Sequence, residues 1–521
     1  MFQENKWKQV CIYRTSVGES VFQFLNDGDD HHHRYLEHLS LVSKQFLSIT
    51  NRFRSSLTIC DLTLPFLPRL LHRFPNLTSL DLSQFHGDLD ELLTHISLFS
   101  LDLRSLNLSN GSAMPSNGLQ ALNEKMKMTL ISLKCVNMDG LRHPNLAPIF
   151  NCFPFLQELD LSHSLGLLDF KLKEVSLVLP KLRKINLSGN NISDQSLFYL
   201  CKNCEFLEEI EMMSVYHITV AGVASAIRER PGLRCLSFTI SNSAVLALER
   251  PHSLFTASLF SLKGLTCLDL SFSCVEDKLL FSLAEECLPL RRLGFQCCFG
   301  YSYSGIYRLL SKCQSLQHLN LQKANFLYDQ HFARLCLFLA ELISINVSFC
   351  SNLTESTLFA FAKNCPLLTD INMEETSIGK MVAENLNSSV DFVVSPQVKS
   401  LHLKGNAWLM DESIQIFATF FPNLELLDLS SCYCIFDGVD EVLRRGCNIK
   451  HLSLASSFGA KLFEMNFVVP KLEVLNLSRS ATDDEALYEI SKSCCGLLQL
   501  DLENCYDVTD KGVRQVVEKC R

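Results

Sequence analysis

Apolar residues recur along most of the chain in one short pattern, Leu-x-x-Leu-x-Leu, in which Ile or Val replaces single leucines. Residues three and five positions after the opening leucine alternate with polar residues, so they face the same side of a short strand. The pattern occurs seventeen times at a mean period of about 26 residues, with openings at Leu77, Leu103, Leu130, Leu156, Leu182, Leu207, Leu233, Leu265, Leu290, Leu316, Leu342, Leu368, Val398, Leu424, Ile449, Leu472 and Leu497.

Each predicted strand is followed by a turn and then by a helix. A stretch such as Ile192-Ser193-Asp194 or Val508-Thr509-Asp510 predicts a helix cap, and apolar residues at helical spacing come after it. Eight residues after the opening leucine, the turn requires a side chain that is small or that can bond the backbone. The amides and thiols at this position are Asn190, Cys298, Cys350, Asn406, Cys432 and Cys505.

One strand and one helix cannot bury a core alone, but stacked units can. A period in the twenties with this apolar core is the signature of the leucine-rich repeat. We therefore predict an α/β leucine-rich-repeat solenoid of about 17 repeats over residues 77–521, shaped as a curved horseshoe with parallel strands inside and helices outside. A degenerate unit at residues 57–76 is interpreted as an N-terminal capping repeat.

Cysteine also recurs in frame. The chain has 23 cysteines in 521 residues, fewer than in scaffolds held together by disulfides. In this frame they resemble the cysteine-containing subtype of leucine-rich repeat that is typical of intracellular F-box proteins, and we expect unpaired thiols in the core. The cysteines that lie three positions before an opening leucine are Cys204, Cys287, Cys313, Cys365 and Cys494.

The segment before the repeats has a different pattern. Residues 1–14 are atypical, and residues 15–59 predict two short helices separated by a polar loop. The second helix, expected from about Arg34 to Ile49, carries an apolar stripe that leaves Leu41 outside it. Two short helices are too few for a core of their own, so they must pack on the repeats or on a partner.

The runs Ser20-Val-Phe-Gln-Phe-Leu25 and Leu41-Val42-Ser43-Lys44-x-Phe46 resemble the F-box of plant F-box/leucine-rich-repeat proteins. In that family the F-box docks on a Skp-type adaptor, and through it on a cullin, within an SCF ubiquitin ligase. The repeats hold a protein substrate for ubiquitin-dependent proteasomal degradation. The resemblance implies adaptor contacts by Phe22, Leu25, Leu41, Val42, Ser43 and Phe46.

The opening of this segment departs from the family pattern. The family begins its F-box with Leu-Pro, whereas this chain has Tyr13-Arg14 and then Val17-Gly18-Glu19. Loss of the proline removes a helix-start signal. An alternative function is therefore a leucine-rich-repeat binding scaffold or inhibitor whose degenerate F-box recruits no ligase.

The inner face of the predicted solenoid is lined by the residues two, four and six positions after each opening leucine. A ladder of carboxylates and amides at the fourth position could recognise a polar protein segment, although such residues are also the ordinary consensus of this repeat. Aromatic residues after the strand at Leu290 could anchor a partner or instead fill space between repeats. The candidate substrate-binding residues are Asp269, Asn320, Asn346, Phe299, Tyr301 and Tyr303. By contrast, Trp408 and Phe326 lie where the repeat needs a core residue.

Composition narrows the function classes. A net charge of −9 and a pI near 5.9 argue against a nucleic-acid partner. No apolar run reaches the roughly 18 residues of a membrane span, and no secretion signal is visible, so we expect the cytosol, the nucleus or both.

The chain also lacks the motifs of a catalytic or metal protein. We find no phosphate loop, no Gly-x-Ser-x-Gly and no His-Glu-x-x-His, and expect a non-catalytic receptor with no cofactor and no metal. Cys201-x-x-Cys204 has zinc-ligand spacing, but no second pair follows, and both thiols suit a helix core. The run His31-His32-His33 fits a solvated spacer.

Overall fold

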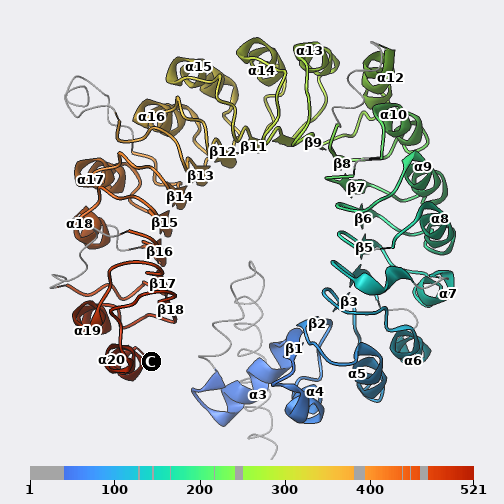
Figure 1. The fold of residues 1–521 in the computed structure, drawn as a ribbon, viewed down its shortest axis with the longest axis horizontal. Coiled ribbons are helices and arrows are strands. Elements are labelled where there is room, and N and C mark those ends of the chain that lie inside the picture. Colours follow the sequence, from blue (N-terminus) through green and yellow to red (C-terminus); the bar gives the residue numbers. More distant parts are fainter. Residues whose placement is uncertain are drawn as a thin grey trace, which may run out of the picture. The chain divides into compact units, whose positions relative to one another are not determined.

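The computed structural model describes residues 40–520 except 127–129, 143–145, 165, 216, 241–249, 381–393, 437, 446–447 and 458–466. Most of the predicted F-box, including Phe22 and Leu25, lies outside the described residues. The chain divides into two compact units, Met1–Leu233 and Arg234–Arg521. Within each unit, strands and helices alternate along the chain, with the strands on one side of the stack and the helices on the other (Figure 1).

The described part of the first unit contains seven strands. Its strands are β1 (Ser56–Cys60), β2 (Ser79–Gln84), β3 (Ser105–Asn107), β4 (Ser132–Lys134), β5 (Glu158–Asp160), β6 (Lys184–Asn186) and β7 (Glu209–Met212). Its helices are α3 (Lys44–Phe53), η1 (Leu64–Phe66), α4 (Leu67–Arg73), α5 (Leu89–Ile96), α6 (Ser116–Met126), η2 (Asp139–Arg142), α7 (Ala147–Phe150), α8 (Asp169–Val178), α9 (Asp194–Asn203) and α10 (Val220–Arg228).

The described part of the second unit contains eleven strands. They are β8 (Cys235–Phe238), β9 (Cys267–Asp269), β10 (Arg292–Gly294), β11 (His318–Asn320), β12 (Ser344–Asn346), β13 (Asp370–Asn372), β14 (Ser400–His402), β15 (Leu426–Asp428), β16 (His451–Ser453), β17 (Val474–Asn476) and β18 (Gln499–Asp501). The helices are α12 (Arg250–Leu259), α13 (Asp277–Glu286), α14 (Tyr303–Leu310), α15 (Asp329–Leu335), η3 (Cys336–Phe338), α16 (Glu355–Asn364), α17 (Asp411–Phe420), α18 (Gly438–Arg445), α19 (Asp484–Ser493) and α20 (Asp510–Lys519).

Within each unit, the described strand pairs are parallel and join equivalent positions of successive repeats. Leu80 is opposite Leu106 in the first unit, and Leu293 is opposite Leu319 in the second. Because side chains alternate along a strand, this constant register brings the leucine or isoleucine at the same position of each repeat into one buried row within each unit. Leu80, Leu106 and Leu319 are at most 2% exposed. The predicted parallel strands and alternating helices are confirmed.

The turn after the strand requires a left-handed backbone. In fifteen of the repeats the residue seven positions after the opening has a positive φ, and two of these residues are the glycines Gly189 and Gly405. At this position the backbone N–H donates to the next repeat, as from Phe272 to the Gln296 carbonyl at 2.7 Å. A positive φ costs a non-glycine residue free energy, so this inter-repeat bond must offset that cost. The other thirteen are Asn110, Asn137, His163, Ser214, Phe272, Cys297, Lys323, Phe349, Glu375, Ser431, Ser456, Arg479 and Asn504.

The predicted turn residues at position eight are buried and bond the backbone. The Asn406 amide donates to the carbonyls of Leu403 (2.8 Å) and of Met373 in the preceding repeat (2.9 Å), and its oxygen accepts the Thr376 N–H at 3.1 Å. A thiol fills the same place with one donor, since Cys350 Sγ donates to the Leu321 carbonyl at 3.4 Å. This prediction is confirmed.

The predicted helix caps are also confirmed, and they link neighbouring repeats. Ser193 caps α9 and Thr509 caps α20. The acidic residue at the start of one helix reaches the cap of the next repeat: Asp277 of α13 accepts the backbone N–H of Ser302 at 2.8 Å and its hydroxyl at 2.6 Å. Gly305 stands beside this carboxylate, which a β-carbon there would overlap.

The thiols follow the prediction with one correction. Every cysteine among the described residues is a free thiol, and Cys204, Cys313, Cys365 and Cys494 are buried. Burial raises the pKa of Cys204 to about 12, so this thiol stays neutral. Cys287, in contrast, is exposed, because it ends α13 in a left-handed conformation (φ 49°) that directs the chain away before its side chain reaches the core.

Removing the Asn406 amide tests the turn bonds. We expect Asn406→Ala to lower the free energy of unfolding by about 2–4 kcal/mol, because it leaves buried carbonyls and the Thr376 N–H without partners. Asn406→Cys should cost less, since a thiol serves at this position in other repeats. Denaturation followed by circular dichroism measures both, with hydrogen exchange at Thr376 as the local readout. Equal losses for the two variants would contradict this account.

Gly305→Ala tests the inter-repeat cap. Alanine favours a helix interior by about 1 kcal/mol over glycine, yet we expect net destabilisation because the new methyl group displaces the Asp277 carboxylate from Ser302. Gly264→Ala is the matched control, since nothing lies within 4 Å of the added β-carbon there. Thermal unfolding of the full chain compares the two, and a stabilised Gly305→Ala variant would refute the inference.

Candidate protein-binding surfaces

The N-terminal helix α3 begins later than predicted. Ser40 is helical, Leu41 and Val42 form a turn, and Ser43 caps α3 by accepting the Phe46 N–H at 3.2 Å. The expected single helix from Arg34 to Ile49 is therefore wrong, because the Ser43 cap starts a new helix. The side chains of Leu41 and Val42 stand on this turn, 84% and 65% exposed.

The inner side of α3 is occupied by its own residues and by the first repeats. Ile49 is 2% exposed, with Phe46 and Phe53 packed against it. Asn51 accepts a hydrogen bond from Arg73 at 3.0 Å, and the Asn76 amide donates to the Arg52 carbonyl at 2.9 Å. Of the expected adaptor contacts that are described, Leu41, Val42 and Ser43 are exposed at one end of α3, whereas Phe46 is half-buried.

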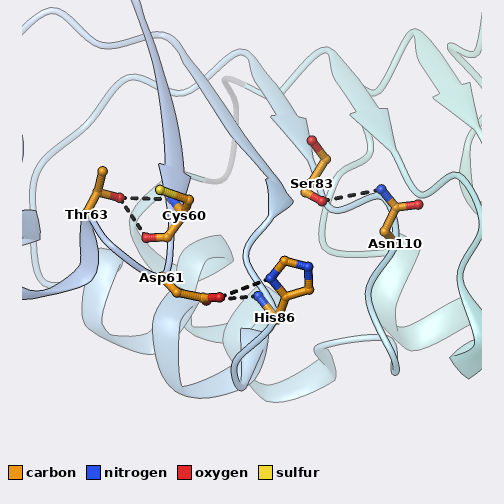
Figure 2. A network of polar contacts seen from close by, with 6 residues as sticks. All are labelled: Cys60, Asp61, Thr63, Ser83, His86 and Asn110. Carbon is orange, nitrogen blue, oxygen red and sulfur yellow. Dashed lines mark hydrogen bonds and ion pairs between the residues drawn. The ribbon is translucent and has the colours of Figure 1, made fainter. Parts of the chain in front are cut away.

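Polar contacts join the first strands at their carboxyl ends (Figure 2). After β1, Asp61 accepts the His86 backbone N–H at 3.1 Å and contacts the His86 ring nitrogen Nδ1 at 3.0 Å. The backbone bond, followed by the ring contact, holds the pKa of Asp61 below its usual range. Thr63 closes the turn on Cys60, and the Asn110 amide donates to the Ser83 carbonyl at 3.3 Å. These contacts fix the exposed turn that follows β1.

The polar side chains four positions after each opening leucine accept hydrogen bonds from the backbone of their own repeat. Asp269 accepts the Ser271 N–H at 2.9 Å, Asn320 the Gln322 N–H at 3.1 Å and Asn346 the Ser348 N–H at 2.9 Å. Such a bond two residues along the chain stabilises a turn and ends the strand. All three side chains remain partly exposed on the strand face, so one atom of each can still meet a partner.

A groove on the strand face of the first unit crosses β4 to β7. It encloses about 280 Å³ above the buried residues Leu133, Leu159 and Ile185. Lys184 pairs with Glu209 across the groove at 3.1 Å. The charged residues that line it carry more negative than positive charge and are Lys134, Lys184, Glu158, Asp160, Glu209 and Glu211.

Sequence reasoning did not single out this groove. A signal for it was present in the sequence, since each of four successive repeats carries a charged residue at the second strand position, the fourth, or both. The groove arises because these residues differ in length and pair laterally, which depends on neighbours about 26 residues apart in the chain. No single repeat contains that information.

The predicted aromatic anchors behave differently from one another. Phe299 is 48% exposed, as expected of a contact residue. Tyr301 is only 6% exposed, with its ring 5.6 Å from Phe295 and 4.9 Å from Phe326, and burial raises its pKa. Tyr301 is thus a core residue that fills space between repeats, the second of the two predicted alternatives, and not an exposed partner contact.

Of two further aromatic positions, Tyr303 fills space between repeats, as one alternative predicted, and Trp408 corrects the prediction. Tyr303 opens α14 and stacks on His331 of the next repeat, with ring centroids 4.1 Å apart, so it is half-buried between repeats. Trp408 was expected in the core but is 54% exposed. Leu409, fully buried beside it, takes the core position instead. The residue that this turn buries lies one position later than predicted, so Leu409 is in the core and Trp408 is outside it.

The comparisons with known proteins agree with this architecture. A family model described as "Leucine Rich repeat" matches residues 178–201, from the end of α8 to α9. Among solved structures, Rad7 in its complex with Elc1 from yeast is similar over 90% of this chain and 97% of its own, with a TM-score of 0.50 and 16% identity. TLR13 in a complex with a single-stranded RNA is similar over 85% of this chain and 65% of its own, with a TM-score of 0.42 and 19% identity.

No helix among the described residues is long and apolar enough to cross a membrane. The in-frame leucines, the parallel strands in constant register and the alternating helices agree with the matched repeat family. The chain has the leucine-rich-repeat fold, an α/β solenoid with cysteine-rich repeats, and the family model matches one of these repeats directly.

Proposed function

We propose that this protein is the substrate-recognition subunit of an SCF-type ubiquitin ligase. Its F-box-like segment, residues 15–59, docks a Skp-type adaptor and through it a cullin, and its repeats bind a protein substrate for proteasomal degradation. The observation that carries the proposal is the exposed pair Leu41 and Val42 at the end of α3.

The exposure of this pair is unusual for a helix that has already satisfied its own packing. α3 buries Ile49 and packs Phe46 and Phe53 against it, so Leu41 and Val42 are not needed for its core. Adjacent large apolar side chains in water favour a partner that covers them, since burial of a leucine or valine contributes about 1.5–3 kcal/mol. The pair lies within the run that resembles an F-box, which supports an adaptor as that partner.

The similarity to yeast Rad7 supports the same architecture. Rad7 is a chain of similar length and fold that was crystallised with the partner Elc1. We extend partner binding of this kind to the present chain as part of the proposal.

For the substrate, the groove across β4 to β7 is the first candidate surface. Its excess of carboxylates favours a protein segment with Lys or Arg side chains. Phe299, Asp269, Asn320 and Asn346 on the second unit remain candidate substrate contacts.

The alternative is a binding scaffold or inhibitor that recruits no ligase. It is favoured by the missing Leu-Pro before Val17 and by Gly18, which weakens a predicted helix. The two functions differ in one property, adaptor binding, so a single experiment separates them.

The adaptor contact is tested by Leu41→Asp combined with Val42→Asp. Both side chains are exposed, so the fold should be retained, but carboxylates without partners in an apolar interface should weaken binding by orders of magnitude. Co-purification with a Skp-type adaptor from cells is the measurement. Leu98→Asp, at a leucine that is 70% exposed after α5, is the matched control and should bind normally.

Two outcomes contradict the proposal in different ways. If the unmodified chain does not bind the adaptor, the ligase function is wrong and the scaffold takes its place. If the unmodified chain binds and the double variant binds equally well, the contact lies elsewhere on the F-box-like segment.

The substrate surface is tested by reversing charge in the groove. We expect Glu158→Lys with Glu209→Lys to reduce the ubiquitylated proteins captured with the chain when the proteasome is blocked, while adaptor binding is unchanged. The reason is that two positive charges repel a basic segment and unpair Lys184. Glu485→Lys on the exposed side of α19 is the control. Capture unaltered by the groove variant would exclude the groove as the substrate site.

A further inference from the structure

Three potential metal ligands come together on the strand face of the second unit. One ligand atom each from Glu374, His402 and Asp428 lies within 4.8 Å of the other two, the one group of this kind among the described residues. Neither the leucine-rich repeat nor the proposed ligase function requires such a group. We propose that these side chains form a binding site for a divalent transition-metal ion of the zinc type.

The backbone brings the three residues together. His402 of β14 is opposite Asn372 of β13 on one side and Asp428 of β15 on the other. Glu374 follows Asn372 by two residues, so it continues along the same face of the sheet. Neighbouring strands are about 4.8 Å apart, which is within the reach of ligands around one ion.

The ligand chemistry favours zinc-type ions. One imidazole and two carboxylates suit Zn²⁺, Co²⁺ or Mn²⁺ better than Mg²⁺, which prefers oxygen alone. Bonds of about 2.1 Å place tetrahedral ligand atoms about 3.4 Å apart. Side-chain rotations that move these ligand atoms by roughly an ångström would bring them to that separation. The three side chains are half-buried, so they have room to rotate and an open side for an ion to enter.

Each ligand is oriented by a hydrogen bond from a residue outside the group. The Asn372 amide donates to Glu374 Oε1 at 3.2 Å, and Ser430 N–H donates to Asp428 Oδ1 at 2.9 Å. The Ser400 hydroxyl contacts His402 Nε2 at 3.0 Å. Such outer contacts hold metal ligands in place and leave a second atom on each side chain for the ion.

The charge balance of the site also favours a cation. His402 Nε2 lies 3.7 Å from a further carboxylate, Asp370. Across the described residues, no Lys or Arg forms an ion pair with Glu374 or Asp428. A bound divalent ion would neutralise the carboxylates.

The test is a Co²⁺ titration of the full chain followed by optical absorption, with Zn²⁺ and Mg²⁺ as competitors. We expect one Co²⁺ bound without thiolate charge-transfer absorption, displaced by Zn²⁺ and not by Mg²⁺. His402→Ala and, separately, Glu374→Gln should weaken binding at least tenfold. His451→Ala, on the strand after β15, is the matched control and should bind normally.

The experiment distinguishes the proposed site from two other groups of the chain that can bind cobalt. The His31-His32-His33 run can bind cobalt, so the titration is repeated in a chain with all three replaced by alanine. Exposed thiols such as Cys287 would produce thiolate absorption. The proposal is overturned if this chain binds no Co²⁺, if binding survives in His402→Ala, or if the absorption shows thiolate ligands. None of these outcomes depends on adaptor binding, so the ligase proposal is tested independently.

Discussion

The structure depends on how each repeat bonds the backbone where its strand ends. The turn there is tight, left-handed and partly buried, so carbonyls and N–H groups would lack partners within one repeat. Asn406 or Cys350 donates to the preceding repeat, and the left-handed residue donates to the following one. A single repeat is therefore unstable alone, and stability arises between neighbours.

This constraint also limits which residues can recognise a partner. The polar residue at the fourth strand position is held by the turn, as Asp269 and Asn346 show, so one of its atoms is already committed. Specificity must come from positions that are not committed in this way. Charged residues at the second strand position of the groove, such as Glu158 and Glu209, are such positions. Asp160 and Asp428 are held by their turns and offer only their second oxygen.

The N-terminal segment follows a different principle. α3 contacts the first repeats through polar bonds such as Arg73 to Asn51, and it buries a small apolar cluster around Ile49. What remains exposed is Leu41 and Val42 on the preceding turn. The exposed residues of α3 itself, such as Lys44 and Gln45, are polar, so the apolar surface of this segment is confined to that turn.

Much of the fold was predictable from the sequence because the repeat presents each requirement seventeen times. The strand leucines, Asn406 in its turn and the Ser193 cap each follow from contacts at fixed spacing within or between adjacent repeats. F-box residues were recognisable only by resemblance, and the implied roles of Leu41 and Phe46 stay predictions.

The sequence by itself determined the repeat, its strands, its turn residues and its caps, since these depend on local spacing. Only the tertiary structure decided which turn residues are buried and which residues of different repeats come together. Tyr301 is in the core and Trp408 on the surface because the buried turn residue of both repeats lies eleven positions after the opening residue, at Tyr301 and Leu409. Cys287 is exposed because it ends its helix in a left-handed conformation, whereas Cys204 and Cys365 end theirs with a negative φ. The group around His402 joins three strands whose residues are far apart in sequence, so only the parallel register could bring them together.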